Sequence, residues 1–312
     1  MAQEKQVTPV AAIDIGTNTV LLLVGKFQNG RLITIDEAQQ LPRLGRDVDS
    51  NGVISDDAVS RVIEAITVFQ DRITQKFGTI PIKVTATSAV RDAENRDEVV
   101  RRITSATGLE VMILTGRAEA ELTYHGALSM VDPTEYHHAV IDIGGGSTEI
   151  ISGSHTGIDR AVSLNIGCVR FSERFLPQLP VREEQIERCR SAVSKELHSA
   201  EINLKNFGDV LTGVAGTVTS LAALHQDLEG YDPARINSHI IPLDEIEKML
   251  QWIASCTKEK LEASNPTVMK GRADIMSAGM IILTEVMKFG GFAHLRVSTG
   301  GLRHGILLES FS

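Results

Sequence analysis

The sequence has few cysteines, and they do not form a recognisable set. Cys168, Cys189 and Cys256 are odd in number, and their spacing matches neither a disulfide framework nor a zinc site. We therefore expect reduced, structural thiols. Long apolar runs are also missing, since no stretch approaches the ~18 residues of a membrane span. The segment before Asp14 has neither a basic region nor a long apolar core. The sequence predicts a cytoplasmic protein without a membrane partner.

An excess of positive charge is absent as well. The chain has 31 Lys and Arg against 40 Asp and Glu, which gives a net charge of −9. A general nucleic-acid binder needs a basic surface, so this class is disfavoured. A small phosphate-rich substrate remains compatible, because a few arginines and a divalent cation can bind it locally. A Walker lysine loop, a G-x-S-x-G elbow and a cysteine in a reactive setting are also lacking.

What the sequence does contain is one motif twice. Asp14-Ile15-Gly16-Thr17-Asn18-Thr19 is echoed by Asp142-Ile143-Gly144-Gly145-Gly146-Ser147-Thr148. Each copy follows a short apolar run, precedes a second one, and leads through another turn into a third extended segment. Small residues at such a turn let backbone amides approach an anion. We interpret the repeat as two phosphate-binding hairpins. The alternative, two ordinary glycine-containing hairpins, is disfavoured by the matching contexts.

The segments between the repeats alternate between strand and helix patterns. A helix capped by Ser55 is followed by a strand at 82–87, a helix at 96–106 and a strand at 109–114. This β-α-β unit places Ser88, Arg91 and Asn95 at the carboxyl end of a parallel strand, where α/β folds bind ligands. The second half predicts a helix at 182–205, a strand at 209–212, and a small-residue turn at 213–220 that opens a helix. Further helices are expected at 244–256, 273–289 and 303–311, and a strand at 295–298.

The length of 312 residues and the 42% hydrophobic content suit two domains of ordinary size. No low-complexity linker separates them, so the boundary is expected to be a hinge near residues 126–133. We therefore predict domains at 1–128 and 129–312. In this division the last helix can still pack back on the first domain. The duplicated strand units with helices resemble the actin-like superfamily, and this resemblance implies an α/β fold class with two actin-like (ribonuclease-H-like) domains and an interdomain cleft.

A chain-wide set of motifs resembles one family within the actin-like superfamily. The blocks AIDIGTNT, LGRDV, ATSAVRDAEN, TGRAEAEL, DIGGGSTEI, LNIGCVR, GVAGTVTSL, GRADIMSAGMIIL and VSTGGLRHGIL occur in that order. They are similar to signature blocks of the exopolyphosphatase/guanosine pentaphosphate phosphohydrolase family. The resemblance implies hydrolysis of terminal phosphate from inorganic polyphosphate or guanosine pentaphosphate (pppGpp). It also implies Mg²⁺, or another divalent cation, as cofactor, and it is compatible with a homodimer.

The acidic residues divide into a metal set and a catalytic candidate. Asp142 and Glu149 flank the second turn, so both can reach a cation at its mouth. Asp14, at the equivalent place in the first repeat, completes the predicted metal set. The resemblance assigns Glu119 as the base that orients water, a role that partial burial would support. Spacing alone would make Glu119 and Glu121 exposed acids of an early helical turn. Ala118 stands where many family members have another acid.

Small residues, hydroxyls and arginines form the predicted phosphate-binding set. Arg91 is the first choice, because a guanidinium suits bidentate phosphate contact; its alternative is a solvent-exposed helix-entry residue. Leu21 departs from a basic residue that many members have, which would weaken the first turn's contact. Longer members also carry a further helical domain, and this sequence stops at Ser312. The expectation that the protein binds long polymers is weaker for this reason. The full predicted set is Thr17, Asn18, Arg91, Gly144, Gly145, Gly146, Ser147, Thr148, Gly216, Thr217 and Arg272.

Other functions remain open at this stage. An ATP-dependent kinase or ATPase of the same superfamily would need a nucleoside pocket near residues 213–216. A polyphosphate or nucleotide sensor would bind without turnover, and Glu119, Asp142 and Glu149 together disfavour it. The sequence does not choose between polyphosphate and pppGpp, whose terminal phosphates are nearly the same, nor does it give the preferred polymer length, cation or oligomeric state.

Overall fold

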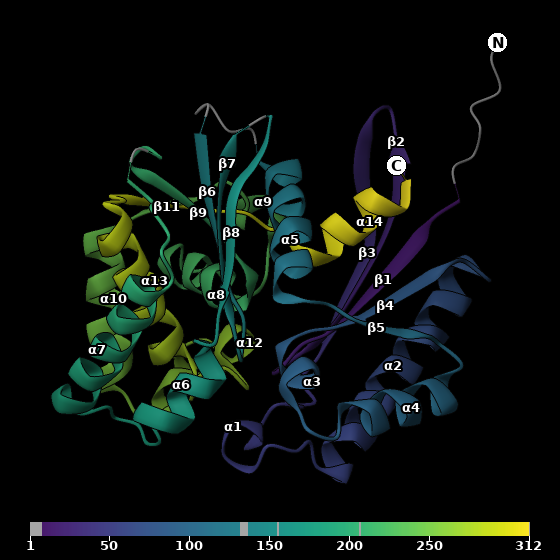
Figure 1. The fold of residues 1–312 in the computed structure, drawn as a ribbon, viewed down its shortest axis with the longest axis horizontal. Helices are drawn as coiled ribbons and strands as arrows, with labels where there is room; N and C mark the ends of the chain where they lie inside the picture. Colours follow the sequence, from purple (N-terminus) through teal and green to yellow (C-terminus); the bar gives the residue numbers. More distant parts are fainter. Residues whose placement is uncertain (1–7, 132–136, 155, 206, 312) are drawn as a thin grey trace. The chain divides into compact units, whose positions relative to one another are not determined.

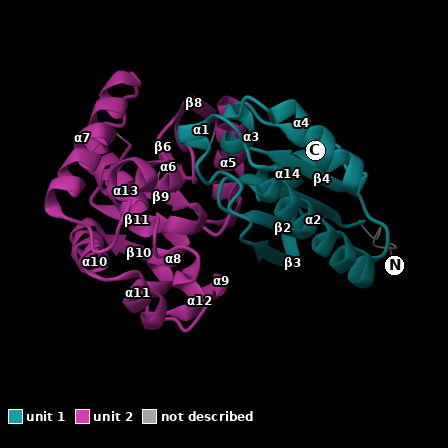
Figure 2. Cartoon of the chain, turned by 90° about the horizontal axis from the view of Figure 1, so that it is seen from below, with its two compact units in different colours: residues 1–115, 302–312 teal, residues 116–301 magenta. Residues whose placement is uncertain are grey.

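The computed structural model describes residues 8–131, 137–154, 156–205 and 207–311. The chain divides into two compact units, which are coloured separately in Figure 2: unit 1 holds the chain up to Thr115 together with residues 302–312, and unit 2 holds residues 116–301. None of the helices in the described ranges has both the length and the apolar character that crossing a bilayer requires.

Unit 1 is built on a five-stranded sheet with the order β3-β2-β1-β4-β5. Its antiparallel part is β1 (Val10–Ile15), β2 (Val20–Gln28) and β3 (Arg31–Gln40). The strands β4 (Ile82–Ala86) and β5 (Val111–Ile113) extend the sheet in parallel with β1. The helices of the unit are α1 (Val48–Asn51), α2 (Asp56–Phe77), α3 (Ser88–Asp92), α4 (Arg96–Thr107) and α14 (Leu302–Phe311).

Unit 2 repeats this plan with one more strand (Figure 1). Its sheet order is β10-β11-β9-β6-β7-β8, in which β6 pairs antiparallel with β7 and parallel with β9. The strands are β6 (His137–Ile143), β7 (Thr148–Ser154), β8 (Gly157–Leu164), β9 (Val210–Val214), β10 (Ile240–Pro242) and β11 (His294–Val297). The helices are α5 (Gly116–Met130), α6 (Cys168–Phe175), α7 (Glu183–Ser199), α8 (Ala215–His225), α9 (Pro233–Ile236), α10 (Leu243–Ser255), α11 (Lys258–Ser264), α12 (Pro266–Met269) and α13 (Met276–Gly290).

The sequence repeat is therefore a structural repeat. The order β3-β2-β1-β4-β5 corresponds strand for strand to β8-β7-β6-β9-β11. The turns match too, because the amide of Gly16 donates to the Thr19 carbonyl (2.9 Å) as that of Gly144 donates to the Ser147 carbonyl (3.0 Å). The prediction of an α/β fold with two related actin-like halves is confirmed.

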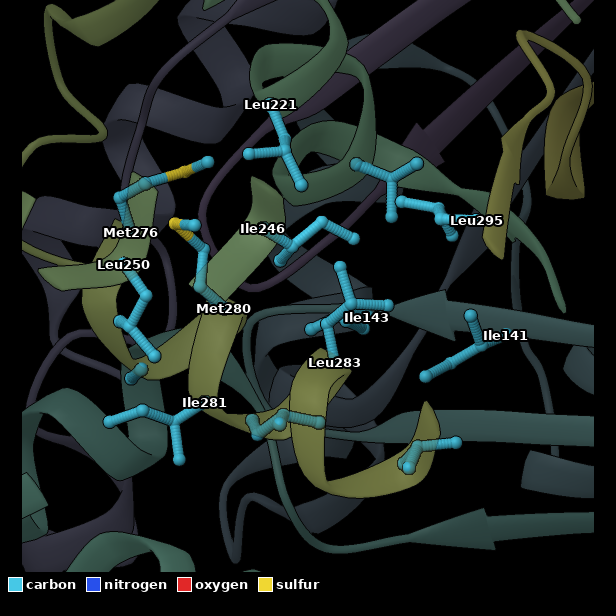
Figure 3. Packing of buried hydrophobic residues seen from close by; sticks show 14 of the residues in the cluster. Ile141, Ile143, Leu221, Ile246, Leu250, Met276, Met280, Ile281, Leu283 and Leu295 are labelled. Carbon is cyan, nitrogen blue, oxygen red and sulfur yellow. The ribbon is translucent and has the colours of Figure 1, made fainter. Parts of the chain in front are cut away.

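Each unit has its own apolar core. In unit 2, isoleucines of β6 pack with side chains of α8, α10, α13 and β11, among them Ile141, Leu221, Ile246, Leu283 and Leu295 (Figure 3). In unit 1, the amphipathic α2 begins at its predicted cap, where the Ser55 hydroxyl accepts a hydrogen bond from the Ala58 amide. Burial of these apolar faces supplies the main driving force for each core.

Several expected element boundaries differ from the structure. The charged helix expected at 182–205 ends at Ser199 and is followed by Glu201, whose positive φ of 50° is incompatible with a continuing helix. The small-residue turn expected at 213–220 is a direct junction, because β9 ends at Val214 and α8 begins at Ala215. The division between the units falls after Thr115, earlier than the expected boundary after residue 128. Helix α5 packs on β6, β7 and β8 of unit 2, whereas α14 packs on β1, β2 and β3. Residues 132 and 133 of the expected hinge lie outside the described ranges.

A carboxylate on β3 forms ion pairs with two cationic side chains of α2, and we expect these ion pairs to stabilise the folded state of unit 1. Asp36 accepts hydrogen bonds from Arg72 Nε (2.6 Å) and Nη2 (2.7 Å) and from Lys76 Nζ (2.8 Å). The hydrogen bond from Arg72 is the main cause that lowers the pKa of Asp36 to about 2.

We expect Asp36→Asn to lower the free energy of unfolding at pH 7 by about 1–2 kcal/mol. A depressed carboxyl pKa stabilises the folded state above the unfolded pKa of about 3.9. This stabilisation is lost as the pH falls through the folded value near 2. Urea unfolding of both proteins at pH 7 and at pH 2.5 measures the difference, which should shrink at the lower pH. An equal difference at both values would contradict the ion-pair explanation.

Candidate active site

The turn of the second repeat, at residues 144–147, lies between two carboxylates that face each other across a strand pair. In the register of β6 and β7, Asp142 lies opposite Glu149, and Ile143 lies opposite Thr148. Directly opposed side chains of an antiparallel pair point to the same face of the sheet. The same register in unit 1 pairs Asp14 with Leu21. Of the two repeats, only the one in unit 2 therefore has two opposed carboxylates at this place.

A third carboxylate comes from α5, which packs on the same face of the sheet. Glu119 lies in the first turn of this helix with only 7% of its surface exposed. The neighbouring acid Glu121 has a side chain that is 42% exposed and forms an ion pair with Arg117 (2.8 Å). The two acids therefore have different environments, which spacing alone did not distinguish. One helical turn after Glu119, the Thr123 hydroxyl donates a long hydrogen bond to Asp142 Oδ2 (3.4 Å).

The electrostatics of the cluster follow from burial and from the repulsion of like charges. Burial, and then the charge of Glu119, raise the pKa of Asp142 to about 7, against the opposing hydrogen bond from Thr123. Burial raises the pKa of Glu149 well above its usual range, with Glu119 and Asp142 adding to the effect. A cluster of this kind is expected to take up a cation or protons, because either relieves the repulsion.

Glu149 is contacted by the hydroxyls of Ser163 and Ser147, and one of its two oxygens is still buried without a hydrogen-bond partner. Its side chain is fully buried, and Oε1 accepts a hydrogen bond of 2.6 Å from the hydroxyl of Ser163 on β8. Oε2 is buried and has no hydrogen-bond partner. A buried carboxylate oxygen without a donor is costly, and a bound cation would satisfy it.

The carbonyl groups of the turn are bound to the first turn of α6. The amide of Cys168 donates to the Gly144 carbonyl (2.9 Å), and the amide of Val169 donates to the Gly145 carbonyl (2.9 Å). Arg170 Nε donates to the Gly146 carbonyl (2.8 Å). In a trans peptide the N–H points opposite to the C=O of the same unit. The amides of Gly145, Gly146 and Ser147 therefore point away from α6, and such an array of amides is suited to an anion. Thr148 does not add its hydroxyl to this array, because it donates to the Ile166 carbonyl (2.6 Å).

Gly167 allows this close approach of α6. A Cβ atom at this position would lie 2.5 Å from the carbonyl carbon of Gly145 and 2.6 Å from that of Gly146. Real Cβ atoms do not approach backbone atoms so closely. The orientation of the turn therefore depends on the absence of a side chain at residue 167.

A second polar group forms where Arg272 meets the start of α8. Gly216 packs directly against the Arg272 guanidinium, and a Cβ there would overlap it. Arg272 is partly buried. Its loss of solvation lowers its pKa, and it lies close enough to Cys168 for their charges to interact. Thr217 forms a hydrogen bond to the Cys168 thiol, whose pKa is raised by burial to about 11. The structure thus brings Gly216, Thr217 and Arg272 together, next to the residue whose amide binds Gly144.

Cys168 was not predicted as part of this group, and only its place in the block LNIGCVR could have suggested it. The junction beside it is strained, because Ala215 has a positive φ of 67°. A non-glycine residue in this conformation costs free energy and is enriched at functional sites.

The remaining predicted residues lie in unit 1. The amides of Arg43 and Gly45 donate to the carbonyls of Asn18 (3.1 Å) and Thr17 (2.8 Å), so this turn is held by a neighbouring loop. The Thr17 hydroxyl is hydrogen-bonded to that of Ser88 (3.0 Å). The side-chain amide nitrogen of Asn18 is buried and has no hydrogen-bond partner, which suits an acceptor on a ligand.

Arg91 and Asp14 complete the unit 1 set. Arg91 lies on α3, directly after β4, and its Nη1 donates to the Leu114 carbonyl (3.1 Å). Asp14 is the penultimate residue of β1, as Asp142 is of β6. Across the described ranges, no group of three or more His, Cys, Asp or Glu side chains is arranged to hold a metal ion. A Mg²⁺ ion, however, commonly uses one or two carboxylates together with water and substrate phosphate. Asp142 and Glu149 fit this pattern.

The duplicated sheets and their matching turns place the chain among actin-like α/β proteins. Within that class, the family model of the Ppx/GppA phosphatase family matches residues 23–312, and the chain belongs to this family. It is 31% identical to exopolyphosphatase 2 of Mycobacterium tuberculosis, over 97% of this chain and 98% of that protein. The Ppx/GppA family member of Aquifex aeolicus is similar in structure, with a TM-score of 0.81, 30% identity and 98% of both chains covered. An exopolyphosphatase-like protein has a TM-score of 0.91 and 28% identity, again with 98% of both chains covered.

Proposed function

We propose that this protein is a phosphoanhydride hydrolase that releases terminal phosphate from inorganic polyphosphate, from pppGpp, or from both. Family membership and the similarity to an exopolyphosphatase support the substrate class. The observation that carries the proposal is the turn at residues 144–147, whose amides point away from α6 beside Asp142 and Glu149. This arrangement suits a bound phosphate chain at the amides and a cation at the carboxylates.

Asp142 and Glu149 would hold a Mg²⁺ ion or another divalent cation, and the assignment of Asp14 to the metal remains a prediction from the sequence. A bound cation would neutralise phosphate oxygens. Glu119 would orient the attacking water and accept its proton, because it is buried and lies close enough to raise the pKa of both neighbours. The amides of Gly145, Gly146 and Ser147 would stabilise the charge that develops on the departing phosphoryl group.

The other predicted residues would bind the phosphate chain. Arg272 would contribute a guanidinium that packs on Gly216, and Arg91 would contribute one from unit 1. Thr17 and Asn18 would bind through the first turn, where Asn18 has an unpartnered buried donor. No residue is assigned to a covalent phosphoenzyme. A cytoplasmic location and a homodimer remain predictions.

The test is phosphate release with Mg²⁺ from long-chain polyphosphate, short-chain polyphosphate, pppGpp and ATP in parallel. We expect release from polyphosphate or pppGpp, and loss of that release on chelation with EDTA. Turnover confined to ATP would favour the kinase or ATPase alternative. Tight binding of these ligands without release from any of them would favour a sensor.

A further inference from the structure

Ser163 lies directly opposite Glu149 across the pair formed by β7 and β8. The two side chains therefore project from the same face of the sheet at adjacent positions. The Ser163 hydroxyl donates to Glu149 Oε1 over 2.6 Å, the length typical of a hydrogen bond to an ionised carboxylate. In the first repeat the equivalent strand pair places Gln39 opposite Leu21. A hydroxyl and a carboxylate thus occur together in unit 2, where unit 1 has neither.

This hydrogen bond fixes the direction of the second carboxylate oxygen. The terminal torsion of a glutamate is broad and nearly two-fold, so an unrestrained carboxylate turns freely about it. Once Oε1 is bound to Ser163, the direction of Oε2 follows. Oε2 is the oxygen that is buried without a partner. Glu149 is contacted by the hydroxyls of Ser163 and Ser147, and the bond from Ser163 to Oε1 is the one that sets where the unsatisfied Oε2 points.

Ser163 is itself held in place by the start of α5. A Cβ atom at Gly116 would lie 2.5 Å from the Ser163 Cβ and 2.7 Å from its Oγ, so the helix backbone contacts the serine with no space between them. This contact limits the rotamers of Ser163. The same helix carries Glu119 in its first turn. Ser163 thus touches both the strand pair with Glu149 and the helix with the proposed base.

We propose that Ser163 is a positioning residue for the cation: it binds Glu149 Oε1 and thereby presents Oε2 as the oxygen that coordinates the metal. The inference rests on the proposed function, in which Glu149 is a metal ligand. Hydrogen bonds of this kind to a liganding carboxylate typically change metal affinity by about 10–100-fold when they are removed.

The experiment measures Mn²⁺ binding to the full-length protein by electron paramagnetic resonance, together with the Mg²⁺ dependence of phosphate release. We expect Ser163→Ala to weaken Mn²⁺ binding about 10–100-fold. The half-saturating Mg²⁺ concentration should rise by the same factor, while kcat at saturating Mg²⁺ changes much less. Ser152→Ala is the matched control, because Ser152 is a buried serine of β7 on the opposite face from Glu149. It should leave the Mn²⁺ affinity unchanged.

A double-mutant cycle tests whether Ser163 acts through Glu149. In a Glu149→Gln background, Ser163→Ala should cause no further loss of Mn²⁺ affinity. Ser163→Cys, with its weaker donor, should give an intermediate affinity and serves as a second variant if the alanine form folds poorly. Wild-type Mn²⁺ affinity in Ser163→Ala and Ser163→Cys would overturn the inference, as would equal losses in both backgrounds. A wild-type protein that binds Mn²⁺ but releases no phosphate would instead overturn the proposed function.

Discussion

Glu119→Gln is expected to lower kcat for phosphate release by about 10²–10⁴-fold, the range of a lost general base. Glutamine keeps the size and the hydrogen-bonding capacity of the buried side chain, but it does not accept a proton from water. The measurement is initial phosphate release at saturating Mg²⁺ with the substrate that the wild type prefers. Substrate affinity should change little, because the amides of the turn and Arg272 are unaltered.

The same substitution should leave cation binding intact or strengthen it. The charge of Glu119 raises the pKa of both Asp142 and Glu149. Its removal lowers these pKa values, so both proposed ligands ionise more easily at neutral pH. The Mn²⁺ affinity therefore shows whether Glu119 is a base or a metal ligand. If Glu119 were a ligand, Glu119→Gln would weaken Mn²⁺ binding.

Glu121→Gln is the matched control for this prediction. It is the same substitution on the same helix, but it removes only an exposed ion pair with Arg117. Exposed pairs of this kind contribute little, so activity should stay near the wild-type level. If Glu121→Gln reduced kcat as much as Glu119→Gln, the assignment of the base would be wrong.

The elements of the site that follow from local pattern could be predicted from the sequence. The two Asp-Gly turns, their flanking strands and the opposition of Asp142 and Glu149 all come from residues close in the chain, where side-chain alternation fixes the register. The strand that precedes Arg91 could also be predicted, because its apolar pattern is local in the chain.

Contacts between distant segments could not be predicted in this way. The packing of Arg272 on Gly216, and the position of Cys168 beside it, depend on how α6, α8 and the residues before α13 come together. The difference between Glu119 and Glu121 depends on which side of α5 packs on the sheet, and their spacing does not reveal this. The contact of the Ser163 hydroxyl with Glu149 appears only once β8 is paired with β7 in a known register.

The backbone of the turn at residues 144–147 should also be sensitive to substitution, as we expect for the proposed catalytic carboxylate. Gly167→Ala places a methyl group against the carbonyl carbons of Gly145 and Gly146. Backbone atoms do not move aside as a flexible side chain does, so either the turn or the start of α6 has to shift. We expect kcat/KM to fall by about 10²-fold, the effect of displacing reacting groups by about 1 Å. Overpacking of this kind should also lower the free energy of unfolding by about 1–3 kcal/mol.

Gly230→Ala is the control, because a Cβ there would meet only the Thr267 side chain, at 3.3 Å from its methyl carbon. This neighbour can move at little cost, so both activity and stability should stay close to those of the wild type. Steady-state kinetics and urea unfolding of the two variants measure the contrast. Since the Gly167 backbone is extended, with φ −148° and ψ 159°, alanine fits its conformation, and the expected loss arises from steric contact alone. Wild-type kcat/KM in Gly167→Ala would show that the turn does not need its present orientation, which would remove the main support for phosphate binding by its amides.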